Sequence, residues 1–211
     1  MENQIPTIRE EDRRFAFACC LELGLGLFAL VMGGAFGVEV RSNIPALSDG
    51  ERCATGLLIG SAAGILMAIV MQGISKIPLR SIQALNEVAS VQLWSLLKGL
   101  STAQLIVLAL TAGVGEELLF RGWLMQSITG SVSTCSMESL VAGIIGSSIL
   151  FGFAHPISRM YVFLAFLMGC FFGILYWCTN NLLVPIAAHW IYDAILMVAF
   201  VRSQGAGRIM R

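Results

Sequence analysis

Residues 103–126 read AQLIVLALTAGVGEELLFRGWLMQ, an apolar run in which only Glu116, Glu117 and Arg121 carry charge. A run of this length is sufficient to cross a hydrocarbon core of about 30 Å as an α-helix. Comparable runs occupy 15–38, 53–74, 140–155, 161–178 and 182–201. The run at 140–155 is short for a full crossing. The sequence therefore predicts an all-α, polytopic membrane protein with about six transmembrane helices.

The overall composition supports lipid as the solvent and excludes several classes of function. The chain is 57% hydrophobic and 12% charged, with a mean hydropathy of +0.82, well outside the range typical of soluble domains. Because apolar runs recur along the whole chain, a lone cleavable signal peptide is excluded. The net charge is zero and no basic cluster contains interleaved aromatics, so we expect no nucleic-acid partner. The six cysteines show no CxxC spacing and are interpreted as small packing residues.

The apolar runs predict one membrane-embedded domain at 15–202, flanked by short polar tails at 1–14 and 203–211. Between the second and third runs, residues 75–100 mix charged side chains with apolar ones at helical intervals. This segment is too polar to span a membrane, and we predict an amphipathic helix lying at the interface.

The distribution of lysine and arginine predicts the orientation in the membrane. Leaving out Arg121, which lies within a predicted span, ten of these residues fall on one side and only Arg41 and Arg52 on the other. Positive charge accumulates on the cytoplasmic side. Both termini are therefore predicted to face the cytoplasm.

The charged groups inside the third apolar run are the first candidates for a functional site. A charged side chain at membrane depth costs at least about 2.5 kcal/mol, so such groups are presumed functional. Glu117 and Arg121 are four residues apart and share a helix face, which makes them the natural ion pair. Glu116 points about 100° away without a local partner. We interpret Glu116 as a candidate general base and Glu117 with Arg121 as support; the alternative is that all three form a structural network.

The only two histidines lie in the second half of the chain, at His155 in FGFAHP and His189 in IAAHWIYDA. Pro156 disfavours continued helix at His155, which predicts that this imidazole lies at a helix terminus and can reach a cavity. Asp193 lies four residues after His189 on the same helix face, where it can orient the imidazole or share a water with it. Together with Glu116, these residues predict a shared polar site.

Glu116, His155, His189 and Asp193 would also form the ligand set if a metal binds. Neither HExxH nor GxSxG occurs in the chain, so the zincin and serine-hydrolase signatures are absent. A water activated by Glu116 is the simpler hypothesis, and we expect no cofactor. Glu22, in the first apolar run, is close enough to the predicted membrane surface to snorkel or to pair with a neighbour, and we expect a structural role for it.

Three stretches, GVGEELLFRGWL, FGFAH and HWIYDA, resemble the three motifs of the CAAX prenyl protease type II and bacteriocin-processing family, also called CPBP or Abi. The family patterns are EExxxR, FxxxH and HxxxN or HxxxD. All three occur here in the right order on successive predicted helices. The resemblance covers about 96–200, whereas the first ninety residues match only in being hydrophobic.

The resemblance implies an intramembrane glutamate endopeptidase in which Glu116 and His155 activate the attacking water. Glu117 and Arg121 would then be the supporting pair. His189 and the residue four positions later would stabilise the oxyanion, an electrostatic role that can supply several kcal/mol. The best-understood members have asparagine where this chain has Asp193. Either Asp193 is protonated, or it orients His189, or the activity is altered.

The substrate implied by the resemblance is a peptide or membrane protein in the lipid bilayer, prenylated or not. CAAX-type processing and bacteriocin maturation or immunity are both open at this point. The alternative from another class is a membrane scaffold or chaperone that retains the fold without cutting. A transporter is a weaker alternative, because the sequence shows no obvious inverted repeat.

Overall fold

The computed structural model describes residues 9–209, and within this range all regular structure is helical. The predicted tails at 1–14 and 203–211 therefore lie partly outside the described residues. The elements in chain order are α1 (Glu10–Phe36), α2 (Gly50–Ser75), α3 (Arg80–Leu97), α4 (Thr102–Glu117), the π-helix η1 (Leu118–Met125), α5 (Gln126–Thr129), α6 (Met137–Phe153), α7 (Arg159–Thr179) and α8 (Leu183–Ile209).

Five helical segments of the described chain are long and apolar enough to cross a membrane, and they confirm the prediction of an all-α, polytopic membrane protein. They are Glu10–Phe36, Gly50–Ile74, Thr102–Thr129, Arg159–Thr179 and Leu183–Gln204. The remaining expected span, at 140–155, corresponds to α6, which has 17 residues. At 1.5 Å per residue, α6 is about 26 Å long and falls short of a hydrocarbon core of about 30 Å.

At both ends of the chain, helix extends into segments that the sequence predicted to be polar tails. Helix α1 begins at Glu10, because three acidic residues occupy its first turn and interact favourably with the helix dipole. The Arg14 guanidinium donates hydrogen bonds of 2.8 Å to the backbone carbonyls of Ser95 and Lys98. Residues 10–14 are therefore fastened to the end of α3. At the other end of the chain, α8 continues through 203–209.

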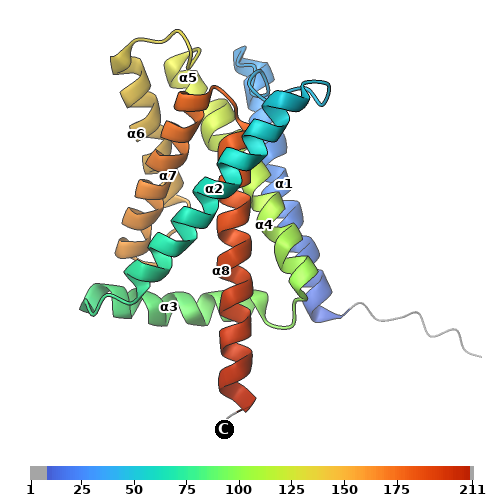
Figure 1. The fold of residues 1–211 in the computed structure, drawn as a ribbon, viewed down its shortest axis with the longest axis vertical. Coiled ribbons are helices and arrows are strands. Elements are labelled where there is room, and N and C mark those ends of the chain that lie inside the picture. The colour runs from blue at the N-terminus through green and yellow to red at the C-terminus, as the bar shows by residue number, and fades with distance from the viewer. Residues whose placement is uncertain (1–8, 210–211) are drawn as a thin grey trace, which may run out of the picture.

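Helix α3 lies across one end of the spanning helices, nearly perpendicular to α8 (Figure 1). Its buried face carries Ile82, Leu85 and Leu97. Val88 and Val91 remain exposed on the outer side. This arrangement is the one expected of an amphipathic helix at a membrane interface, as the sequence predicted for 75–100.

Helix α8 lies in the middle of the bundle, with α1 and α4 to one side of it and α6 and α7 to the other (Figure 1). It packs most extensively on α2 and α4. Glycines permit these close approaches: a Cβ added at Gly60 would lie 2.5 Å from the Val184 carbonyl oxygen and 2.6 Å from the Ala187 Cβ. Helices in lipid associate through such small-residue contacts, because lipid tails are as apolar as the side chains. The packing holds α8 against α4, where the candidate residues lie.

Candidate active site

The third span is one rod in which α4 passes into the π-helix η1 and then into α5. Glu116 and Glu117 form the last two positions of α4, and Arg121 lies in η1. π-helical segments are rare and occur frequently at functional sites. The first predicted motif therefore lies at the junction where the helix changes its winding.

Glu117 and Arg121 form the predicted ion pair. The Arg121 Nη1 lies 2.8 Å from the Glu117 Oε1, and both side chains are 0% exposed. The Arg121 Nη2 donates a second hydrogen bond of 2.8 Å to the Gly169 carbonyl of α7. The guanidinium carbon lies 4.7 Å from the ring centre of Phe151 and 5.3 Å from that of Phe172, both within cation–π range. The cation is thus enclosed by an anion, a carbonyl and two aromatic faces.

His189 of α8 lies between two carboxylates. Its Nδ1 is 3.0 Å from the Glu117 Oε1, which also accepts from Arg121, and its Nε2 is 3.4 Å from the Asp193 Oδ2. Because an ionised carboxylate only accepts hydrogen bonds, the proton between His189 and Glu117 belongs to Nδ1 of His189. The imidazole stacks on Phe172 with 5.0 Å between ring centres and an interplanar angle of 17°. Glu117 therefore joins the first and third motifs.

Glu116 faces the second motif. Its Oε1 lies 3.7 Å from the Nε2 of His155, and its Oε2 is buried without a hydrogen-bond partner among the described residues. Helix α6 ends at Phe153, so His155 lies just beyond a helix terminus, as Pro156 predicted. The Nδ1 of His155 is 2.8 Å from the Phe151 carbonyl. Because a carbonyl only accepts, Nδ1 carries a proton and Nε2 is directed to Glu116.

A cavity of about 410 Å³ contains the four predicted catalytic side chains: Glu116, His155, His189 and Asp193. Glu117 and Arg121 do not line it and lie behind its wall. Most of the remaining wall is apolar, with contributions from α3, α7 and α8. The structure thus brings all six predicted residues into one region and separates them into a cavity-facing set and a supporting pair.

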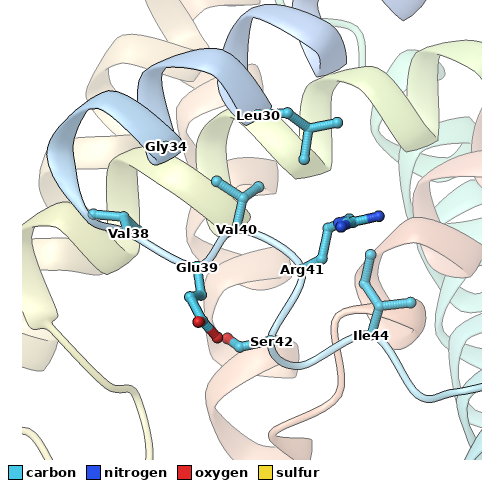
Figure 2. Close-up of a pocket in the computed structure, with 8 residues that line it drawn as sticks. All are labelled: Leu30, Gly34, Val38, Glu39, Val40, Arg41, Ser42 and Ile44. Atoms are coloured by element: carbon cyan, nitrogen blue, oxygen red, sulfur yellow. The ribbon is translucent and has the colours of Figure 1, made fainter.

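A second pocket, of about 800 Å³, lies at the loop that follows α1 and contains none of the six candidates. Its polar side chains are Glu39, Arg41 and Ser42. Figure 2 shows Glu39 and Arg41 pointing in different directions, without convergence on a common point. The pocket lacks a cluster of groups suited to catalysis.

The sequence did not identify several residues that complete the site. Glu22 of α1 lines the cavity, and its Oε2 is buried without a hydrogen-bond partner among the described residues. Gly169, Phe151 and Phe172 enclose the Arg121 guanidinium. No signal in a single sequence links these positions to Arg121, because their contacts depend on how α6 and α7 pack on η1.

The metal alternative concerns the four cavity-facing side chains: Glu116, His155, His189 and Asp193. Within residues 9–209, no group of three His, Cys, Asp or Glu side chains has an arrangement suited to holding a metal ion. All six cysteines have free thiols. The candidate set is thus arranged as two carboxylate–imidazole contacts, Glu116 with His155 and Asp193 with His189.

Part of the chain is similar to a known protein family. Residues 98–195 match the family described as type II CAAX prenyl endopeptidase Rce1-like. The match begins after α3 and ends within α8, so it contains all three motifs and leaves out α1, α2 and α3. No significant match was found among curated proteins or among solved structures. The segment that carries the buried polar residues is therefore similar to the Rce1-like family of type II CAAX prenyl endopeptidases.

Proposed function

We propose that this integral membrane protein is an intramembrane endopeptidase that hydrolyses a peptide bond with a water activated by Glu116 and His155. The observation that carries the proposal is that the two adjacent glutamates have different surroundings. Glu117 is fully buried and committed to Arg121 and His189, whereas Glu116 faces the cavity opposite His155. A general base must be free to accept a proton and must reach the reacting water.

The geometry of Glu116 and His155 suits one water molecule held between them. Their facing atoms are 3.7 Å apart, too far for a direct hydrogen bond. A water oxygen displaced toward the cavity can lie about 2.8 Å from both atoms. Glu116 would take a proton from this water as its oxygen attacks the scissile carbonyl, and would then deliver the proton to the leaving amine. The hydrogen bond to the Phe151 carbonyl holds the His155 ring in place.

His189 is the group that would stabilise the oxyanion. Glu117 orients its ring through Nδ1, which leaves Nε2 beside Asp193 at the cavity wall. Of the three possibilities for Asp193, we favour the one in which it orients His189. Because Nδ1 already carries a proton, a proton on Nε2 makes His189 an imidazolium, held between Glu117 and Asp193. Its fixed Nε2–H would be shared between Asp193 and the oxyanion, and stabilisation of this kind is often the largest single term in acyl transfer.

The substrate class follows from the family and from the cavity. The family name refers to prenylated CAAX proteins, and the largely apolar cavity lies inside a bundle of spanning helices. We propose a membrane-associated peptide as the substrate, prenylated or not, entering from the side of α3. With both termini and α3 on the cytoplasmic side, as the charge distribution predicts, this entry is cytoplasmic. Bacteriocin maturation or immunity is one biological setting that this chemistry would serve.

The test compares new peptide N-termini in membranes that contain the wild type or Glu116→Gln at matched amounts of folded protein. Glu39→Gln provides the matched control, because it makes the same chemical change in the pocket of Figure 2. Fragments found with the wild type and Glu39→Gln but not with Glu116→Gln would support the endopeptidase and identify its substrates. Identical fragments in all three samples, with partners still co-purifying, would support the scaffold instead.

A further inference from the structure

Glu22 is a cavity carboxylate that the mechanism above does not use. It lies on α1, outside the segment that matches the family. Helix α1 crosses α4 close to Glu22. Because Gly115 has no side chain, the α4 backbone can approach the Glu22 carbonyl there. Gly115 directly precedes Glu116, so the crossing places Glu22 beside the proposed catalytic base. The Glu22 Oε2 is buried and accepts no hydrogen bond from the described residues.

The charges that line the cavity are unbalanced at Glu22. Of the lining residues, all of which the structure describes, three are carboxylates, two are histidines and none is lysine or arginine. Glu116 faces His155 at 3.7 Å and Asp193 faces His189 at 3.4 Å. Among the described residues, no imidazole or cation lies within ion-pair distance of Glu22, and His189, which attracts it from farther away, already contacts Glu117 and Asp193.

Arg14, which lies on the same helix, does not pair with Glu22. Arg14 lies two turns earlier on α1, and both of its terminal nitrogens donate to carbonyls at the end of α3. An unpaired carboxylate in an apolar cavity is expensive at membrane depth, and such groups usually mark a ligand site. A bound cation would remove this cost by pairing with the carboxylate.

We propose that Glu22 determines specificity by binding a positively charged group of the substrate close to the scissile bond. The group is an ammonium or a guanidinium, supplied either by a lysine or arginine side chain or by the free α-amino end of the peptide. The inference rests on the proposed endopeptidase activity and deepens it. It assigns to α1, which lies outside the family match, the selection of what enters the cavity.

The experiment uses the full-length chain in membranes, as wild type, Glu22→Gln and Glu22→Lys, with Glu116→Gln as the inactive reference and Glu39→Gln as the matched control. Peptide N-termini define the cut sites of each protein. With the wild type, lysine or arginine is expected at one fixed position near the cut. Glu22→Gln should cut these substrates about tenfold or more slowly, as expected for loss of a charge-assisted hydrogen bond, while cuts at neutral sequences persist. Glu22→Lys should favour aspartate or glutamate at the same position.

Synthetic peptides made from the sites found distinguish the two sources of charge. If a side chain supplies it, lysine-to-glutamine substitution in the peptide should raise KM about tenfold or more for the wild type. If the α-amino group supplies it, N-acetylation should have this effect. Because these peptides are tested on the wild type, they can overturn the proposal even if the Glu22 variants fail to fold. An unchanged preference in Glu22→Gln, an equal loss at all sites, or indifference of the wild type to both peptide changes would overturn the proposal. Failure of the endopeptidase proposal is separate, because it would appear as wild-type fragments identical to those of Glu116→Gln.

Discussion

Replacing each of the two adjacent glutamates by glutamine should separate stability from activity. In Glu117→Gln, the Arg121 guanidinium remains fully buried without a counter-ion. Breaking a buried ion pair by removing one partner costs about 3–5 kcal/mol. The glutamine oxygen can still accept hydrogen bonds from Arg121 and His189, so we expect the lower end, about 3 kcal/mol. That is a large fraction of a typical unfolding free energy of about 5–15 kcal/mol.

Glu116→Gln should behave in the opposite way. The Glu116 carboxylate makes no hydrogen bond with the described residues, and it faces His155 at 3.7 Å. Because no partner is left unpaired, its free energy of unfolding should change by less than about 1 kcal/mol. Activity should be lost, because a carboxamide cannot accept the proton of the attacking water.

The assay is reversible unfolding of the purified proteins in mixed detergent micelles, followed by tryptophan fluorescence, together with peptide cleavage at equal amounts of folded protein. Glu117→Gln should lose stability, and Glu116→Gln should remain as stable as the wild type. Equal destabilisation of the two variants would refute the division of roles, and a fully stable Glu117→Gln would refute the ion-pair argument itself.

Four further outcomes are expected. His155→Gln should reduce peptide cleavage about 10²–10⁴-fold at matched folded protein, measured as initial rates, because it removes a partner of the attacking water. Asp193→Asn should retain activity within about tenfold in the same assay, because the carboxamide oxygen can still face His189, whereas Asp193→Leu should lose more. Gly115→Ala should destabilise the protein by about 1–3 kcal/mol in thermal unfolding, because its Cβ would overlap the α1 backbone, whereas Gly24→Ala, with nothing within 4 Å of the added Cβ, should not. Reporter domains fused to either terminus should show cytoplasmic activity, as the distribution of lysine and arginine predicts.

Much of the fold followed from patterns that are local in the sequence. Apolar run length predicted the spans, and the mixed segment at 75–100 predicted helix α3. Spacing alone predicted the pair of Glu117 and Arg121, because residues four apart share a helix face. Pro156 likewise predicted that His155 lies beyond a helix end. In the last two cases the cause and its effect lie within about one helical turn, and in the first two they lie within one continuous segment of the chain.

Features that depend on tertiary packing were not predictable from these patterns. Apolar periodicity does not distinguish a π-helix from an α-helix over eight residues, so η1 was not anticipated. The contact of Glu117 with His189 joins positions 72 residues apart and depends on the rotation of α8 against α4. Glu22 was expected to snorkel or pair, but the crossing of α1 over Gly115 places it in the cavity. Each outcome is decided by helix–helix geometry.

The buried polar contacts around Arg121 fix how the helices are rotated relative to one another, which apolar packing in lipid does not do. Because lipid tails are as apolar as the helices, a small rotation of α8 changes its contact energy little. Polar contacts are directional: Arg121 links η1 to α7 through the Gly169 carbonyl, and Glu117 links α4 to α8 through His189. These contacts fix the rotation of the helices relative to one another. Since Glu116 is the residue before Glu117, the contacts that orient Glu117 also direct Glu116 about 100° away, toward His155 and the cavity.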